Sequence, residues 1–288
     1  MSRIEGGWTR ALSRWVGRAS RVPSSAAARL YARAVGADLT EAEAGDFPSV
    51  AALFGRRLAP GARPLGGGAG VMLSPADGRF QGGGPLEGGG PPLVVKGQRL
   101  PWRAFLADAP YADAFISGTF FSVYLSPRDY HRVHAPVAGT VIDRIHVPGA
   151  LYPVNALGTR LVSDLFVRNE RVLVRLQTPD FGQVVVAFVG ATNVGSIRLA
   201  FDPELKTNRL HEIDAVRTFD ALSVERGDEL GRFELGSTVV VMTEAPVALE
   251  MTAGARVLYG ARLGVAPPNP SSADGGDASA SRGGASSR

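Results

Sequence analysis

Seven short segments rich in valine, isoleucine and phenylalanine follow one another after residue 119, separated by stretches that contain glycine or proline. β-Branched and aromatic residues favour extended backbone, whereas glycine and proline interrupt it, so each segment predicts a β-strand. The predicted strands are 120–125, 139–147, 171–177, 183–189, 216–219, 237–242 and 255–259. We therefore predict a fold of the α+β class that is mainly β and built from antiparallel sheets.

Glycine dominates the region before these strands. Residues 66–92 contain three Gly-Gly-Gly runs, which predict turns and loose connections between short strands. Two related segments, 74–79 and 135–140, suggest a duplicated hairpin core of the biotinyl/lipoyl type. A carrier domain of that type would need a lysine at a hairpin tip, and neither Lys96 nor Lys206 lies in such a setting. The hairpins are therefore expected to build a core and not to carry a swinging arm.

Arginine is concentrated in the first 35 residues, where seven arginines face one acidic residue, Glu5. Apolar residues recur there at steps of three and four, which gathers them on one face of a predicted amphipathic helix. These residues are Trp8, Leu12, Trp15, Val16 and Ala19. We expect the helix to lie in the interface of an anionic membrane, with arginines meeting lipid headgroups. Two alternatives stay open: a basic helix packed on its own domain by the tryptophans, and an organelle transit peptide.

The sequence contains no apolar run of the about 18 residues that a membrane span requires, and no apolar core of a secretory signal. The protein is therefore expected to lie on a membrane and not to cross it. Further short helices are predicted at 24–35, 48–57 and 101–106. The tail after residue 264 consists mainly of proline, serine, glycine, alanine and aspartate, which predicts disorder.

The composition excludes some kinds of catalytic and metal-binding site. Cysteine is absent, which excludes disulfides, thiolate catalysis and cysteine metal sites. Of the four histidines only His131 and His134 are close in sequence, so we predict no metal site, and we expect His146 and His211 to be structural or exposed. The formal net charge of +4 suggests an anionic partner. Because the basic cluster is an amphipathic helix, we predict a lipid surface and no nucleic acid.

Three side chains that can together activate a hydroxyl nucleophile occur in short motifs far apart in the sequence: Asp77, His134 and Ser237. Ser237 follows Gly236 at the entry to a predicted strand, where Gly-Ser alone would mark a turn. The order Asp, His, Ser also occurs in hydrolases on unrelated folds. A hydrolase would keep an intact chain that reacts with acyl-serine probes, and this reading stays open.

Six ordered motifs between residues 47 and 264 make the chain resemble the phosphatidylserine decarboxylases, which cut themselves at a Gly-Ser bond and turn the serine into a pyruvoyl group. The motifs lie at 47–65, 74–78, 124–134, 169–171, 189–197 and 227–238. The resemblance implies a catalytic domain at 61–264, after a helical membrane-docking region at 1–60 and before a disordered tail at 265–288. It also implies peripheral attachment to the cell membrane, on its cytoplasmic face.

The resemblance assigns roles in self-cleavage. It implies that the Ser237 hydroxyl attacks the Gly236 carbonyl, with His134 as the base and Asp77 fixing the other nitrogen of that histidine. The products would be a chain of residues 1–236 and a chain of residues 237–288, which begins with the pyruvoyl group. These two chains would form a heterodimer, and a homodimer of such heterodimers is a further expectation.

The resemblance also assigns the reaction. The pyruvoyl group would form a Schiff base with the amine of phosphatidylserine and accept the electrons freed when carbon dioxide leaves, giving phosphatidylethanolamine. His131 would return a proton to the carbanion. Arg132 either meets the lipid phosphate or pairs with a local carboxylate. One departure is Pro153, where the family usually has a serine, so any substrate contact made by that serine cannot be carried over.

Overall fold

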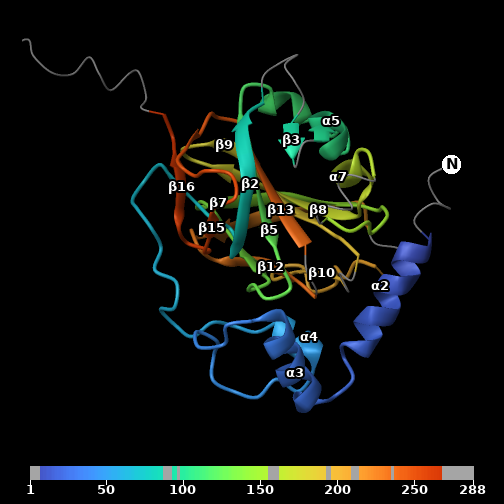
Figure 1. Ribbon diagram of the computed structural model, residues 1–288. Helices are drawn as coiled ribbons and strands as arrows, with labels where there is room; N and C mark the ends of the chain where they lie inside the picture. The colour runs from blue at the N-terminus through green and yellow to red at the C-terminus, as the bar shows by residue number, and fades with distance from the viewer. Residues whose placement is uncertain are drawn as a thin grey trace, which may run out of the picture.

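The computed structural model describes residues 7–86, 93–95, 98–154, 162–192, 196–208, 214–234 and 237–267, with the backbone alone at 93–95 and 98–100. It is mainly β with antiparallel pairing, as predicted (Figure 1). The main sheet has eight strands in the order β11-β7-β8-β9-β13-β5-β2-β15. Their bounds are β11 Val216–Val224, β7 Gly139–Val147, β8 Arg171–Thr178, β9 Gly182–Val189, β13 Ser237–Thr243, β5 Thr119–Leu125, β2 Gly78–Pro85 and β15 Arg256–Val257.

The strand β13 lies in the middle of this sheet and every one of its residues is buried. It pairs with β5 on one side and with β9 on the other. The run Val239-Val240-Val241-Met242 is fully buried on both faces, which explains why it is continuously apolar and does not alternate. The residue that opens this strand, Ser237, is therefore held by the best-packed part of the molecule.

Smaller sheets flank the main one. β1 (Val71–Leu73), β16 (Arg262–Val265) and β14 (Ala248–Leu249) form one, in the order β1-β16-β14. β10 (Ile197–Leu199), β12 (Glu229–Phe233) and β6 (Arg132–His134) form another, in the order β10-β12-β6. β3 (Leu93–Val95) pairs with β4 (Gln98–Leu100), and the short helices α5 (Trp102–Phe105), η1 (Ala112–Phe115) and α7 (Leu165–Arg168) complete the fold.

One glycine run contradicts the prediction of a turn. Gly82-Gly83-Gly84 lies inside β2, where it pairs with β5. A Cβ at Gly83 would lie 2.5 Å from the Phe120 carbonyl oxygen and 2.7 Å from Phe121 Cβ. The two strands can approach because glycine has no side chain. In the sequence, a glycine run in such a strand looks the same as a glycine run in a turn.

The two related segments at 74–79 and 135–140 make matching backbone contacts. Leu73 N–H donates to the Pro136 carbonyl at 3.0 Å, and His134 N–H donates to the Pro75 carbonyl at 2.8 Å. Each segment also leads directly into a strand of the main sheet, β2 or β7, that begins with glycine. The pair shows a local likeness between the two segments, but β1 does not pair with β2 and β6 does not pair with β7, so the duplicated hairpin core stays a prediction. The pair also brings the chain before Asp77 beside the strand that ends with His134.

The helix α2 (Gly7–Ala19) buries its small residues and exposes its large ones. Thr9, Ser13 and Gly17 face the domain, and the Thr9 hydroxyl accepts a hydrogen bond from Leu151 N–H at 3.2 Å. Trp8 and Trp15 are 62% and 67% exposed. The alternative in which the tryptophans pack the helix on its own domain is therefore wrong. The small stripe makes that contact, while the tryptophans of the apolar stripe are exposed. The helix itself lies along the side of the molecule (Figure 1).

Two further helices lie where the sequence predicts them. In α3 (Ser25–Val35) the Ser24 hydroxyl caps the first turn by accepting from Ala27 N–H, and Gly36 ends the helix in a left-handed conformation. α4 (Val50–Phe54) begins after the cap Ser49. α3 and α4 pack together at one end of the β structure (Figure 1). In the part of the chain that the structure describes, no helix has the length and apolar character needed to cross a membrane.

Candidate active site

The candidate catalytic residues come from strand ends and turns at one end of the main sheet. Asp77 directly precedes β2, His134 ends β6 and Ser237 begins β13. A polar cavity of about 250 Å³ is lined by Asp77, Tyr130 and the arginines 56, 63, 128 and 256, among others. The hydrogen bonds of the sheet fix the backbone at the end of a strand. A reactive side chain at that position is therefore held rigidly.

His134 is arranged as a proton acceptor. Its Nδ1 lies 2.7 Å from the Gly227 carbonyl oxygen, and its Nε2 lies 3.2 Å from the Tyr130 hydroxyl. A carbonyl only accepts, so Nδ1 carries the hydrogen and the neutral ring presents a lone pair at Nε2. Burial lowers the pKa of His134 below its usual value. At neutral pH the ring is therefore an uncharged base whose tautomer is set by the backbone.

From the sequence, Asp77 is expected to fix the tautomer of His134, but the Gly227 carbonyl does so. Among the described contacts, Asp77 binds Arg63 through both carboxylate oxygens, at 3.3 and 2.7 Å, and its Oδ1 accepts from Tyr259 N–H at 2.8 Å. The Tyr259 ring in turn stacks on the His134 ring, with centroids 3.9 Å apart and planes 7° apart. Asp77 therefore acts on His134 through the position of Tyr259 and through its negative charge, which raises the pKa of the histidine against the effect of burial.

Ser237 is fully buried and its hydroxyl has no hydrogen-bond partner among the described residues. The structure therefore does not join Ser237 Oγ to His134. Its neighbours are known from register, since Ser237 lies opposite Leu125 of β5. The preceding residue, Gly236, lies outside the described residues. Leaving a buried hydroxyl without a partner costs about 1–3 kcal/mol, and the nearby hydroxyls of Ser122 and Thr238 also have none among the described residues.

His131 is completely buried beside α4. Its Nδ1 lies 2.8 Å from the Asp129 carbonyl oxygen, and its ring meets Phe54 edge-on at 4.8 Å. Its Nε2 has no partner among the described residues. Burial is the main cause that lowers the pKa of His131 to about 4, and the nearby Arg56 lowers it further, against the opposing effect of Asp129. At neutral pH this histidine is uncharged, with a bare lone pair at Nε2.

Arg132 is engaged by the protein through all three of its nitrogens. Nη1 binds Glu229 at 2.5 Å, while Nε and Nη2 donate to the carbonyls of Arg56 and Gly55 at 3.1 and 2.6 Å. Of the two roles considered for Arg132, the pairing with a local carboxylate is the one present in the structure. The arginine fastens β6 to the end of α4.

At two other positions named from the sequence, His146 and the loop with Pro153, the described contacts are hydrogen bonds within the protein. His146 is buried and its Nε2 lies 3.1 Å from the fully buried carboxylate of Glu170. The loop with Pro153 is held by Asn169, whose side chain accepts from Tyr152 N–H and donates to the Tyr152 carbonyl. His211 lies outside the described residues.

Sequence reasoning missed three groups that shape this site: Arg63, Tyr259 and the Gly227 carbonyl. A backbone carbonyl leaves no signal in a sequence, Tyr259 lies in none of the six motifs, and Arg63 lies in the motif 47–65, where nothing points to Asp77 as its partner. Tyr130 directly precedes His131 in a quoted motif, so its place beside His134 could have been suspected. Among the described residues no group of three or more His, Cys, Asp or Glu is arranged to hold a metal ion.

Comparison with known proteins gives the family of this chain. The family model described as phosphatidylserine decarboxylase matches residues 50–265. Curated relatives named "Phosphatidylserine decarboxylase proenzyme" include one from Myxococcus xanthus, 40% identical over 81% of this chain and 85% of the relative. One from Anaeromyxobacter sp. is 40% identical over 88% of this chain and 91% of its own, and one from Pseudomonas aeruginosa is 43% identical over 74% and 75%. The chain therefore belongs to the phosphatidylserine decarboxylase family, a family of carboxy-lyases.

Proposed function

We propose that this chain is a proenzyme that cuts itself between Gly236 and Ser237 and then converts phosphatidylserine to phosphatidylethanolamine and carbon dioxide. The observation that carries the proposal is the fully buried Ser237 hydroxyl, which follows a glycine, opens the central strand and has no partner among the described residues. The proenzyme names of the relatives support the same reading.

Self-cleavage would use groups of this chain and one water molecule. Ser237 Oγ attacks the Gly236 carbonyl carbon, a base takes the hydroxyl proton, and the amide bond is replaced by an ester. Removal of the Cα proton of residue 237 breaks its Cβ–O bond and releases Gly236 as a carboxylate. Water then replaces the nitrogen on Cα, ammonia leaves, and residue 237 becomes a pyruvoyl group. His134 is the base we assign, since its Nε2 carries a lone pair in the neutral ring.

The pyruvoyl group would supply an electron sink for decarboxylation. The role we assign to His131 is to protonate the carbon that loses carbon dioxide, and this requires the ring to be charged first. With a pKa of about 4 the ring is neutral before substrate binds. An anionic substrate placed beside it raises that pKa, so substrate binding and proton supply would be coupled.

The test is the mass of the purified protein under denaturing conditions. We expect two species, residues 1–236 and 237–288, the smaller one lacking the Ser237 amino group and reacting with carbonyl reagents. Ser237→Ala should give one species of about the full 30.2 kDa and no decarboxylation. A single wild-type species that reacts with acyl-serine probes would instead support the hydrolase alternative.

We also propose that α2 docks the enzyme on the cytoplasmic face of an anionic membrane, without crossing it. Its outward stripe carries Trp8, Leu12 and Trp15, at 62%, 40% and 67% exposure, and Arg18 is exposed beside them. Exposed tryptophans flanked by arginine suit a lipid interface, where each apolar side chain loses contact with water. The described residues provide no protein surface that covers this stripe.

Vesicle sedimentation tests the docking. Leu12→Ser should weaken binding to vesicles rich in phosphatidylglycerol, and Trp8→Ser with Trp15→Ser should weaken it by at least about tenfold. Ile116→Ser is the matched control, because Ile116 is exposed to the same extent, 41% against 40%, but lies in the turn after η1. Equal binding by all these proteins would contradict the docking role of α2.

A further inference from the structure

Two arginines stand side by side on the face of the main sheet near the candidate site. Arg256 of β15 pairs with Arg79 of β2, Arg79 pairs with Tyr124 of β5, and Tyr124 pairs with Thr238 of β13. Cross-strand partners project to the same face, so these four residues form one row across four strands. The row ends at Thr238, whose Cα is one residue from that of Ser237, the atom that would become the ketone, while the Ser237 side chain itself projects to the opposite face of the sheet.

This arrangement is unfavourable for the protein alone. Like charges directly opposite on adjacent strands repel each other. Among the described residues neither Arg79 nor Arg256 forms an ion pair, and the single side-chain hydrogen bond from this pair runs from Arg79 to the Gly254 carbonyl at 2.6 Å. Both side chains are exposed. Neither charge is therefore neutralised by an ion pair among the described residues, although the hydrogen bonds from Thr40 and, to a lesser degree, the nearby Arg256 lower the pKa of the Asp38 carboxyl.

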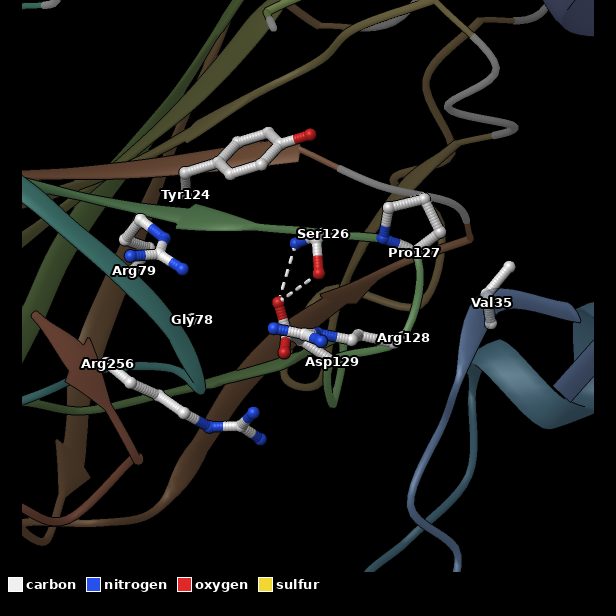
Figure 2. A pocket seen from close by; sticks show the side chains of 9 residues that line it. All are labelled: Val35, Gly78, Arg79, Tyr124, Ser126, Pro127, Arg128, Asp129 and Arg256. Atoms are coloured by element: carbon white, nitrogen blue, oxygen red, sulfur yellow. Dashed lines mark hydrogen bonds between the residues drawn. The ribbon is translucent and has the colours of Figure 1, made fainter. Parts of the chain in front are cut away.

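A third arginine completes the cluster. Arg79, Arg256 and Arg128 line a cavity of about 420 Å³ together with Tyr124, Ser126 and others (Figure 2). Arg128 comes from the loop after β5, on the other side of the cavity from the two strand arginines (Figure 2). The last residue of α3, Val35, contributes to the wall, so the cavity lies where the helical part meets the sheet.

The carboxylates close to the cluster form no ion pair with its three arginines among the described residues. Asp129, in the wall of this cavity, accepts from Ser126 N–H at 2.7 Å and from its hydroxyl at 2.6 Å (Figure 2). The adjoining polar cavity shares Arg128, Asp129 and Arg256 with this one. Its acidic residues also have partners: Asp77 and Glu41 bind Arg63, and Asp38 accepts from Thr40.

We propose that Arg79, Arg128 and Arg256 bind the phosphodiester of the serine headgroup while its amine meets residue 237. The inference rests on the proposed function and names the part of the substrate that this cavity takes. Guanidinium groups suit the purpose because their forked donors match phosphate oxygens. The anion would also relieve the repulsion between the two strand arginines.

The distance from amine to phosphorus in the substrate is similar to the spacing between neighbouring strands of the row. In phosphatidylserine four covalent bonds separate the amine nitrogen from phosphorus, which spans about 5 Å when extended. Neighbouring strands lie about 4.8 Å apart, so β5 is one spacing and β2 about 10 Å from the strand that begins with Ser237. A phosphate lying over Tyr124 would be one strand spacing from Arg79 and two spacings, about 10 Å, from the backbone of Arg256, whose side chain would extend toward it.

The first test compares processed enzymes on detergent-dispersed phosphatidylserine. Arg79→Gln and Arg256→Gln should each raise KM about 10- to 100-fold, the effect of losing a charge-assisted hydrogen bond, with a much smaller change in kcat. Self-cleavage should stay complete, because neither side chain touches Ser237 or His134 in the described contacts. Arg57→Gln is the control, since Arg57 is also exposed and forms no ion pair among the described residues.

The second test needs no catalysis. In the uncut Ser237→Ala protein, binding of sn-glycero-3-phosphoserine is measured by titration calorimetry with and without Arg79→Gln and Arg256→Gln. We expect the double variant to bind at least about tenfold more weakly, while L-serine, which lacks phosphate, binds both proteins alike. Thermal melting should show the variants folded, with Tm equal or higher because the like-charge contact is gone.

The outcomes separate this inference from the function on which it rests. An unchanged KM and an unchanged dissociation constant for glycerophosphoserine would overturn the phosphate site even if the wild-type enzyme is cut and active. Lost vesicle binding with both constants unchanged would overturn it as well, by showing that the arginines contact bulk lipid. Arginine-dependent binding together with a wild-type chain that is never cut would uphold the headgroup site and refute the pyruvoyl chemistry.

Discussion

The burial of His131 predicts that acid destabilises this protein through one identifiable group. In the unfolded chain the pKa of a histidine is near 6.5, whereas burial lowers that of His131 to about 4. Below pH 6.5 the unfolded state therefore takes up the proton first. The contribution of His131 to stability is complete above pH 6.5 and is lost as pH falls toward 4.

The two pKa values set the size of this effect. A tenfold change in proton affinity corresponds to about 1.4 kcal/mol, so the complete loss would be about 3 kcal/mol, of which about 2 kcal/mol is lost between pH 8 and pH 5. The origin is structural, because the ring lies wholly inside, against Phe54, and its Nε2 has no partner among the described residues that could stabilise the charged form.

The assay is urea unfolding at pH 8 and pH 5 of two proteins, Ser237→Ala and the same protein with His131→Asn. The first change keeps the chain in one piece, and asparagine can still donate to the Asp129 carbonyl in the place of Nδ1. We expect the loss of unfolding free energy from pH 8 to pH 5 to be about 2 kcal/mol smaller with asparagine. His134 titrates in both proteins, so its effect cancels. Equal losses would refute the reasoning.

Two further substitutions test the packing that holds the site. Arg171→Lys should lower the free energy of unfolding by at least about 3 kcal/mol in thermal melts. The buried guanidinium donates to four backbone carbonyls, and lysine cannot reach all of them. The control Arg168→Lys, at an exposed arginine, should have little effect. Gly83→Ala should cost about 1–3 kcal/mol, since its Cβ would lie 2.5 Å from the Phe120 carbonyl oxygen, whereas Gly84→Ala, with open space around it, should melt like the wild type. Equal Tm values within either pair would contradict the packing argument.

Most of the secondary structure can be predicted from local sequence. The segment 139–147 agrees with β7 at both ends, and the helix at 24–35 follows from the cap Ser24 and from Gly36, which ends it in the left-handed conformation that glycine favours. The apolar stripe of α2 is also confirmed as one face of a helix. These features succeed because their causes lie within a few residues of each other.

Tertiary contacts account for what could not be predicted. Gly82–Gly84 looks like a turn until β5 is placed against it. The partner of Asp77 is Arg63, and the acceptor for His134 Nδ1 is the carbonyl of Gly227, 93 residues further along. No local pattern marks either pairing, since one involves an ordinary arginine and the other only backbone. The motifs identify which residues gather at the site, but the fold decides which of them touch.

The central place of β13 has a consequence for how a chain cut before Ser237 would hold together. In the part that the structure describes, residues after 236 supply β13 to the middle of the main sheet, β15 to its edge, and β14 and β16 to a small sheet that also contains β1. Cutting before Ser237 would change the covalent connectivity of a molecule whose two pieces are interwoven on both sides of that strand. Neither piece could leave by simple dissociation, so dilution would not separate them and only unfolding would. The cut would break the peptide bond permanently without disturbing the sheet. The new chain end at residue 237 would be free to react while the rest of β13 keeps its place.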